Sequence, residues 1–371
     1  MPMKPLLKWP GGKAREIDQI IDLIPEYDRY IEPFFGGGAM FFHLQPRHAA
    51  INDVSRDLME FYHLIRTQNP EFESALHCYA DSFQGLLEFG RGHSEALLNL
   101  LALLEQDLDA AQNAMSQLLD DWMPQIKALF AQPLILNAEA FRKELEVSLL
   151  DKLCRTVSNH KKTPFSDEDL VENLVTGLAS GYYIYFRSVF NDWQLDRIRL
   201  SAGLRGANFF FIREHCYGSM FRYNKHGEFN IPYGGMSYNK KDFAAKVENL
   251  FLPETASLFS NTQIYSRDFE EFLEQVRPTR RDFMFLDPPY DTEFSDYEGA
   301  SFTKMDQARL AVALSKTPAK FLLIIKNTPY IEALYSQGFH IRKFDKQYTY
   351  NVRSRNDRKA EHLIITNYET E

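Results

Sequence analysis

Hydrophobic and polar residues follow two different periods along this chain. Near both ends, short apolar runs stop at glycine, proline or aspartate, which is typical of buried strands in a parallel sheet. Strands are predicted within residues 29–40, 49–53, 263–269, 283–286 and 321–325. Two further strands, within residues 339–350 and 362–366, are predicted to form an antiparallel pair.

Apolar residues at three- and four-residue spacing predict helices between these strands. The helices fall at residues 16–23, 57–65, 243–252 and 306–314. The same spacing continues over the middle of the chain, at residues 96–104, 115–126, 145–156, 170–178 and 182–191. We therefore expect an α/β fold with a Rossmann-like sheet, and a helical insertion of four to six helices at residues 71–180.

The apolar run at residues 283–286 ends in the sequence Asp287, Pro288, Pro289, Tyr290. Because neither proline can continue a strand ladder, Asp287 is placed at a carboxyl strand end, where open α/β sheets bind ligands. The Asp287 carboxylate and the Pro288 carbonyl are both acceptors, so together they can take the two hydrogens of an exocyclic amine. Tyr290 can stack on the base that carries this amine. A stiffened strand end with a core tyrosine is the structural alternative.

The first strand is followed by a turn of three glycines, Gly36 to Gly38. Their spacing is not the Gly-x-Gly-x-x-Gly of a dinucleotide fingerprint, but it allows a ligand without a pyrophosphate to approach the backbone closely. Asp53 ends the next strand, where a carboxylate can accept from both hydroxyls of a ribose. A helix cap at Asp53 or Ser55 is the alternative.

The chain opens with a second glycine turn, Gly11-Gly12, between Trp9 and Lys13. Lys13 can pair with a carboxylate, and Trp9 can pack on a flat or cationic group. A plain turn anchored by a buried Trp9 would explain the same residues.

Composition limits the class of protein further. The 371 residues are 44% hydrophobic and carry a net charge of −9, which is unusual for a protein that binds nucleic acid. The acidity is local, since residues 71–180 hold 18 acidic and 8 basic residues and the remainder holds 33 and 34. The sequence has three widely spaced cysteines, no signal-peptide pattern and no apolar run of about 18 residues. We therefore expect a cytoplasmic protein without a membrane span.

Four segments together resemble a known family. Lys8 to Lys13, Glu32 to Gly38, Ile51 to Asp53 and Asp287 to Tyr290 follow the order found in the Dam-like adenine N6-methyltransferases of DNA, the D12 class, alpha group. The resemblance covers residues 1–66 and about 181–371. It implies a methyltransferase fold, S-adenosylmethionine as the cofactor and double-stranded DNA as the partner.

The resemblance also implies roles for individual residues. Asp268 is expected to accept from the adenine amine of the cofactor, with a helix cap as the alternative for its side chain. The implied cofactor-binding residues are Trp9, Gly12, Lys13, Glu32, Pro33, Phe34, Gly36, Gly38, Asp53, Asp268, Phe269 and Asp287. The implied catalytic residues are Asp287, Pro288, Pro289 and Tyr290, and the transfer requires no metal.

A β-hairpin around residues 225–227 is the expected DNA-reading element. Its aromatic flanks and its turn predict two short strands, and a hairpin of this size fits the major groove. In the resembled family the matching hairpin belongs to the target-recognition domain. The DNA-binding residues implied by the resemblance are Lys8, Arg222, Asn224 and Tyr233. Arg353 and Arg355 lie in a basic loop that suits phosphates and are also expected to bind DNA. A structural hairpin and a solvated basic turn are the alternatives.

We therefore expect a catalytic domain at residues 1–70 and 251–371, an acidic helical insertion at 71–180 and a target-recognition domain at 181–250. The insertion is open to three interpretations, which are inert packing, a clamp on DNA and a surface for a protein partner. The resemblance also admits a cognate restriction nuclease as a partner. Cytosine N4 or RNA as the substrate, and a DNA-binding or partner-recruiting protein with a vestigial methylase site, are the alternative functions.

Overall fold

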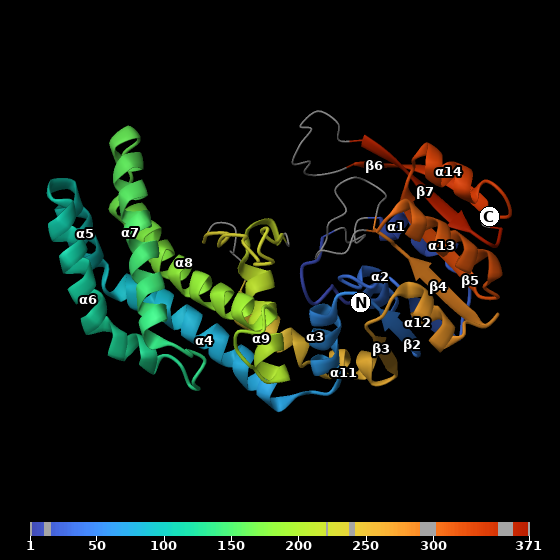
Figure 1. Ribbon diagram of the computed structural model, residues 1–371, viewed down its shortest axis with the longest axis horizontal. Coiled ribbons are helices and arrows are strands. Elements are labelled where there is room, and N and C mark those ends of the chain that lie inside the picture. Colours follow the sequence, from blue (N-terminus) through green and yellow to red (C-terminus); the bar gives the residue numbers. More distant parts are fainter. Residues whose placement is uncertain are drawn as a thin grey trace. The chain divides into compact units, whose positions relative to one another are not determined.

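The computed structural model describes residues 2–10, 16–219, 222–236, 242–289, 302–347 and 359–369 (Figure 1). The chain divides into two compact units. The sheet unit comprises residues 1–66 and 253–371, and the helical unit comprises residues 67–252. The division expected at residue 180 falls inside one continuous helix, so the predicted insertion and the predicted recognition domain share the helical unit.

The sheet unit is built on one mostly parallel sheet, as predicted. Within the described residues it has seven strands in the order β3-β2-β1-β4-β5-β7-β6. The strands are β1 (Arg29–Glu32), β2 (Ala49–Asn52), β3 (Thr262–Tyr265), β4 (Asp282–Leu286), β5 (Lys320–Lys326), β6 (His340–Gln347) and β7 (Lys359–Thr366). β7 pairs antiparallel with β5 and β6, and the other pairings are parallel. The predicted final antiparallel pair is therefore confirmed.

The sheet register brings three strand ends to one edge. Ile31 of β1 lies opposite Ala50 of β2 and Met284 of β4. All three strands run parallel, so the residues that end or follow them lie at the same edge of the sheet. These residues are Glu32, Asp53 and Asp287. This edge is where open α/β sheets bind ligands.

Helices cover both faces of this sheet. They are α1 (Ile17–Ile20) with the 3-10 turn η1 (Ile21–Leu23), α2 (Ala39–Leu44), α3 (Arg56–Arg66), α11 (Pro253–Ser260), α12 (Phe269–Val276), α13 (Lys304–Lys316) and α14 (Pro329–Tyr335). The single helix predicted at residues 16–23 is thus split at Ile20.

Strand alternation sends neighbouring residues to opposite faces of the sheet. On one face, Ile31 and Met284 pack with residues of α12, α13 and α14. On the other face, Tyr30 lies against Phe41 of α2, with ring centroids 6.3 Å apart, and Phe41 lies against Phe259 of α11. Each such fully buried side chain contributes about 1.5–3 kcal/mol relative to exposure.

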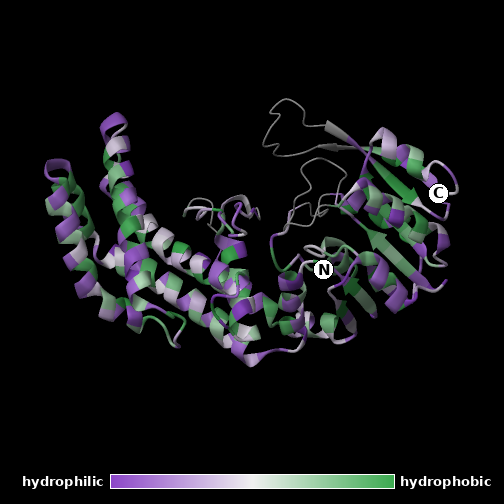
Figure 2. Ribbon diagram, in the orientation of Figure 1, coloured by the Kyte–Doolittle hydropathy of each residue, from purple (hydrophilic) through white to green (hydrophobic). Residues whose placement is uncertain are grey.

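The helical unit consists of long amphipathic helices, also as predicted. They are α4 (Pro70–Gly92), α5 (Ser94–Gln106), α6 (Leu108–Ala128), α7 (Ala138–Lys162), α8 (Asp167–Gln194), α9 (Ala202–His215), the 3-10 turn η2 (Tyr217–Ser219) and α10 (Phe243–Leu250). Figure 2 shows that these helices mix hydrophobic and hydrophilic residues, whereas β4 in the sheet unit is mostly hydrophobic. None of the helices in the described residues is long and apolar enough to cross a lipid bilayer.

Side-chain caps and close helix contacts shape this unit. Asn69, Asn137 and Ser166 accept a backbone N–H at the start of α4, α7 and α8. α7 and α8 pack so closely that a Cβ at Gly181 would lie 2.7 Å from the Cα of Leu145. A side chain at this position would force the two helices apart.

Candidate functional site

Three carboxyl groups meet at the carboxyl edge of the sheet. Glu32 is almost completely buried, and the hydroxyl of Tyr30 donates to its Oε2 at 2.8 Å. Burial raises the pKa of Glu32 well above its usual range; the Tyr30 hydrogen bond opposes this shift, and the negative charges of Asp287 and Asp53 add to it. Electrostatic interactions therefore link the three groups, and together they favour a cationic ligand at this edge.

Asp53 ties the glycine turn to the start of α3. Its Oδ2 accepts from the N–H of Gly36 at 2.9 Å, and its Oδ1 accepts from the N–H of Ser55 at 3.0 Å. Ser55 Oγ accepts from Leu58 N–H, so the helix cap weighed above lies at Ser55. Burial raises the pKa of Asp53, against these backbone hydrogen bonds. The backbone of Val54 also donates to this carboxylate, which leaves one of its four lone pairs for a ligand.

Trp9 packs directly on the glycine turn. A Cβ built on Gly36 would lie 2.8 Å from Trp9 Cδ1, and one on Gly37 would lie 3.1 Å from Trp9 Cβ. Gly36 also has a φ of +49°, so both its backbone angle and the contact with Trp9 require glycine. The contact brings the N-terminal segment, with the half-buried Lys8, to the carboxyl edge. Gly12 and Lys13 lie outside the described residues.

The Asp-Pro-Pro turn, residues 287–289, follows directly on β4. Asp287 and Pro289 are half-buried, and Pro288 is buried. The carbonyl oxygen of Pro289 accepts from Nε2 of Gln307 on α13 at 3.0 Å. Tyr290, the expected stacking residue, lies outside the described residues.

Asp268 occupies the first position before α12. Its Oδ1 accepts from the N–H of Glu270 at 2.9 Å, so the helix cap weighed for this side chain is present. Arg309 of α13 donates to both carboxylate oxygens, at 2.7 Å and 3.3 Å. The side chain remains 39% exposed. This leaves room at Asp268 for a further donor from a ligand.

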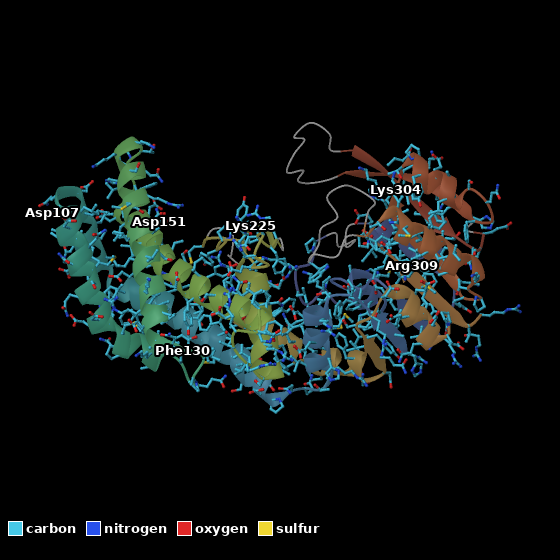
Figure 3. All side chains as sticks on the ribbon, viewed as in Figure 1. Asp107, Phe130, Asp151, Lys225, Lys304 and Arg309 are labelled. Atoms are coloured by element: carbon cyan, nitrogen blue, oxygen red, sulfur yellow. The ribbon has the colours of Figure 1, made fainter. Side chains whose placement is uncertain are left out.

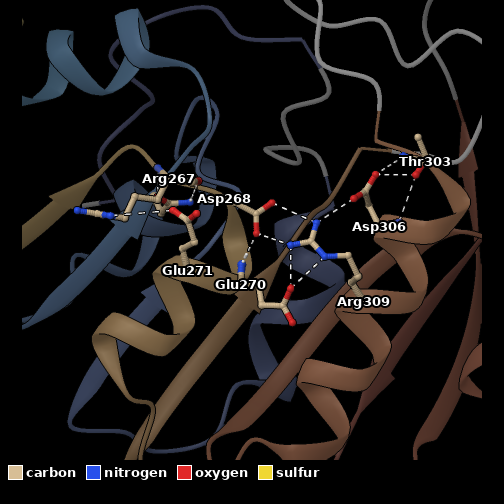
Figure 4. A network of polar contacts seen from close by, with 8 residues as sticks. Arg267, Asp268, Glu270, Glu271, Thr303, Asp306 and Arg309 are labelled. Atoms are coloured by element: carbon tan, nitrogen blue, oxygen red, sulfur yellow. Dashed lines mark hydrogen bonds and ion pairs between the residues drawn. The ribbon is translucent and has the colours of Figure 1, made fainter.

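Arg309 is the centre of a polar network that connects α12 with α13 (Figure 4). In addition to Asp268 it donates to Glu270 Oε2 at 2.8 Å and to Asp306 Oδ1 at 3.0 Å. Its hydrogen bonds with Asp268 and Glu270 raise its pKa. Thr303 and Asp306 form a capping box at the start of α13, which fixes the end of the helix that carries Arg309.

An aromatic cluster lies next to this network. Phe34, on the segment after β1, has its ring centroid 5.6 Å from Phe269 and 5.5 Å from Phe302, and the last two are 5.8 Å apart. The Arg309 guanidinium lies 4.9 Å from the centroid of Phe269. Phe34 and Phe269, predicted from segments far apart in the sequence, thus contact each other. Such a group of rings suits a flat heterocycle.

The hairpin of the helical unit is less regular than predicted. In the described residues, two isolated antiparallel bridges, Cys216 with Tyr233 and Tyr223 with Phe229, replace the expected strands. The Asn224 side chain shapes the turn, since its Oδ1 accepts from the N–H groups of His226 and Glu228.

The two other hairpin residues predicted to bind DNA differ in exposure. Tyr233 is half-buried, with its ring centroid 5.7 Å from that of Tyr183. Arg222 is exposed, and its Nε donates to Asn230 Oδ1 at 3.1 Å. Lys225 lies at the outer end of the turn (Figure 3). The basic side chains are therefore more accessible than the amide of Asn224.

Side chains of α8 hold the hairpin. Asn191 donates to the carbonyl of Phe229 at 3.0 Å and accepts from the N–H of the same residue at 2.8 Å. Tyr183 and Arg187 both donate to the carbonyl of Ile231, each at 3.0 Å. The hairpin backbone is thus positioned by a helix about 40 residues earlier in the chain.

The strand order, with motifs at the carboxyl ends of β1, β2 and β4, defines a class I methyltransferase fold. A model of the D12 class N6 adenine-specific DNA methyltransferases matches residues 9–84 and 140–350, and the chain belongs to this family. The match includes residues 71–84 and 140–180, which lie within the insertion predicted at residues 71–180. The unmatched residues 85–139 contain α5 and α6.

Individual relatives are similar over most of the chain or nearly all of it. The type II methyltransferase M.CviBI of Paramecium bursaria Chlorella virus NC1A is 25% identical over 99% of this chain and 100% of its own length. M.MjaIII of Methanocaldococcus jannaschii, also a type II methyltransferase, is 27% identical over 99% of this chain and 100% of its own length. The DNA adenine methylase of Escherichia coli K12 is 22% identical over 82% of this chain and 73% of its own length.

The structure extends the set of site residues predicted from sequence. Glu32, Asp53 and Asp287 meet at one edge, and Trp9 joins them through the glycine turn. Gln307, Arg309 and Phe302 were not among the predicted site residues. The capping signature of Thr303 and Asp306 marks the start of α13 in the sequence, but it does not show what the helix contacts. Arg353 and Arg355 lie outside the described residues.

Proposed function

We propose that the protein transfers a methyl group from S-adenosylmethionine to N6 of an adenine that has left the DNA stack. The observation that carries this proposal is the meeting of Glu32, Asp53 and Asp287 at the ends of three adjacent parallel strands. Membership of the D12 class supports adenine in DNA as the substrate. Asp287 is the first residue of the Asp-Pro-Pro turn, which offers acceptors for an amine.

The residues at the carboxyl edge suit this cofactor. The carboxyl groups of Glu32 and Asp53 favour a cationic ligand, and Asp53 has a lone pair left for a ribose hydroxyl. Phe34 and Phe269 offer rings for an adenine, and Asp268 an acceptor for its amine. Pro33, Gly36 and Gly38 would line the approach on the backbone side. When bound, S-adenosylmethionine supplies an electrophilic methyl group on a positively charged sulfur.

The Asp-Pro-Pro turn would orient the target base. Asp287 Oδ and the Pro288 carbonyl accept the two hydrogens of the adenine amine, which turns the nitrogen lone pair toward the methyl carbon. A new N–C bond forms as the S–C bond breaks, and the nitrogen then loses one proton, for which the Asp287 carboxylate is the nearest proposed acceptor. Tyr290 would stack on the base, and Pro289 fixes the chain between them. Positioning supplies most of the rate enhancement.

DNA would be bound by the hairpin of the helical unit. Arg222 and Lys225 are exposed there, and a side-chain scaffold on α8 fixes the backbone that carries them. Tyr233 and Asn224 remain proposed DNA contacts, although base contact by Asn224 would compete with its bonds inside the turn. Lys8, Arg353 and Arg355 are proposed phosphate contacts.

The test is a methylation assay with a defined product. Purified protein is incubated with S-adenosylmethionine and DNA from a host without adenine methylation. The DNA is digested to nucleosides, and the methylated nucleoside is identified by mass. We expect N6-methyladenine, and sequencing that detects modified bases then gives the recognition site. Product at cytosine N4, or product on RNA alone, would contradict the proposed substrate.

If no product forms, isothermal calorimetry with S-adenosylmethionine shows whether the protein binds the cofactor. An enzyme assayed on the wrong substrate should still bind it. S-adenosylmethionine should bind the free protein at one site. DNA binding without S-adenosylmethionine binding would instead favour a recruiting protein with a vestigial methylase site.

A further inference from the structure

Gln307 is a fully buried polar residue that the reaction proposed above does not use. It lies near the start of α13, and its Nε2 donates to the carbonyl oxygen of Pro289 at 3.0 Å. Its Oε1 is also buried and has no hydrogen-bond partner in the described part of the chain. Glutamine is mostly exposed in folded proteins, and a buried acceptor without a donor is costly. A structural role alone would be served better by an apolar side chain.

We propose that Gln307 is a positioning residue that fixes the Asp-Pro-Pro turn for the methyl transfer. The proline ring locks φ of Pro289, so ψ is its remaining soft backbone angle. The direction of the Pro289 carbonyl is set by this ψ, and the hydrogen bond from Gln307 restrains it. The same ψ determines the direction in which the chain continues to Tyr290. Because Gln307 bonds to the Pro289 carbonyl, the Pro288 carbonyl stays available for the target amine.

Two residues near the start of α13 contact different parts of the proposed site. Gln307 contacts the Asp-Pro-Pro turn, and Arg309, two residues later, binds Asp268 at the proposed adenine end of the cofactor. If both are positioning residues, they must affect different steps. Gln307 should act on the transfer step, and Arg309 on cofactor affinity. This inference rests on the proposed function, because it assigns the two residues to steps of that reaction.

Two substitutions of Gln307 test its hydrogen bond. Gln307→Met keeps the length of the side chain and removes the donor. Gln307→Glu keeps the shape and replaces the donor by a carboxylate oxygen that faces the Pro289 carbonyl. Leu310→Met is the matched control, since Leu310 is equally buried on the same helix and carries no polar group. For each protein, kcat, the affinity for S-adenosylmethionine and the thermal midpoint are measured.

We expect Gln307→Met to lower kcat about 10- to 100-fold while the cofactor affinity changes less than about twofold. Gln307→Glu should show the same loss at pH 8 and recover part of it, relative to wild type at the same pH, as the pH falls, because the protonated carboxyl is again a donor. A kcat equal to that of Leu310→Met would overturn the proposal, as would a parallel fall in kcat, affinity and thermal midpoint. Absence of methylation by the wild-type protein would instead contradict the proposed function.

Discussion

The two units of this protein position their proposed functional groups in different ways. In the sheet unit, Glu32, Asp53 and Asp287 are placed by the backbone, because each ends or follows a strand of the same parallel sheet. In the helical unit, the hairpin is placed by side chains of α8, chiefly Asn191 and Tyr183. The proposed chemistry therefore depends on a regular sheet, and the proposed recognition depends on a small number of hydrogen bonds.

This difference predicts how each unit tolerates substitution. A group placed by a strand end can be removed without moving its neighbours, so its loss should affect the chemistry alone. A hairpin held by side chains can be displaced without any change to the residues that would touch DNA. The variants below test this contrast, and they are ordered from the largest expected effect to the smallest.

The largest effect is expected for Asp287→Ala. It removes the proposed acceptor for the target amine but leaves β4 and the sheet register unchanged. Methylation should fall by at least about 100-fold, while S-adenosylmethionine still binds. Initial rates with radiolabelled cofactor and calorimetry measure the two effects. Glu271→Ala, which removes an exposed carboxylate of α12, is the control and should retain full activity. An active Asp287→Ala enzyme would contradict the mechanism.

The next largest effect is expected for Asn191→Ala in the helical unit. It deletes both hydrogen bonds to Phe229, each worth about 0.5–1.5 kcal/mol, and frees the hairpin from α8. DNA affinity should weaken about tenfold, with no change in the affinity for S-adenosylmethionine. Fluorescence anisotropy with a labelled duplex measures the first quantity.

Asn173→Ala is the control for Asn191→Ala. Asn173 lies on the same helix, and among the described residues its side chain bonds only to the carbonyl of Asp169 one turn earlier. Equal DNA binding by the two variants would show that the hairpin does not depend on its anchor to α8.

A smaller effect is expected for Arg309→Lys, which tests whether the sheet unit also uses side-chain scaffolding. A lysine cannot match the bidentate contact with Asp268 or reach Glu270 and Asp306 at the same time. Because the network is partly exposed, we expect only about a three- to tenfold loss of cofactor affinity, with kcat retained at saturation. Arg267→Lys, at a longer contact with Glu271, should show no loss. A fall in kcat at saturating cofactor would place Arg309 in the transfer step instead.

The smallest effect is expected for Glu32→Gln, seen in the pH dependence of stability. The folded-state pKa of Glu32 is raised, so the folded protein holds this proton more tightly than the unfolded chain. The free energy of unfolding should therefore fall as the pH rises from the pKa of Glu32 in the unfolded chain to its pKa in the folded protein. The Glu32→Gln variant has no such proton and should not show this loss.

Thermal melts of Glu32→Gln and of wild type at pH 5 and pH 8 measure the effect of that proton. The variant should be more stable than wild type at pH 8, and the difference should be small at pH 5. The opposite trend would mean that Glu32 is stabilised in its charged form.

Much of the sheet unit could be predicted from sequence because its signals are local. The apolar run at residues 283–286, the glycines at 36–38 and the aspartate at 53 each mark a strand end within a few residues. Gln307 and Arg309 could not be assigned in this way. Their partners, Pro289 and Asp268, are brought to them only by the packing of α13 on β4 and α12, which no short pattern encodes.

The helical unit shows two other limits of sequence-based prediction. The boundary expected at residue 180 lies within α8, where the apolar spacing of residues 170–178 simply continues through 182–191. Asn224 has the residue type expected for reading adenine, yet its amide oxygen closes the turn. Residue type alone does not distinguish an Asx-type turn from a base contact, since both use the same amide.

The sheet unit is assembled from both ends of the chain, which has a consequence for its synthesis. β1 pairs with β4 through residues that are about 250 positions apart, and β2 pairs with β3 across a similar interval. A ribosome that has translated residue 252 has therefore synthesised every helix of the helical unit but neither of these partner strands. Folding should begin with the helical unit and end with the sheet. A chain terminated at that point would keep the hairpin and lack Asp287, so we expect it to have no methylase activity.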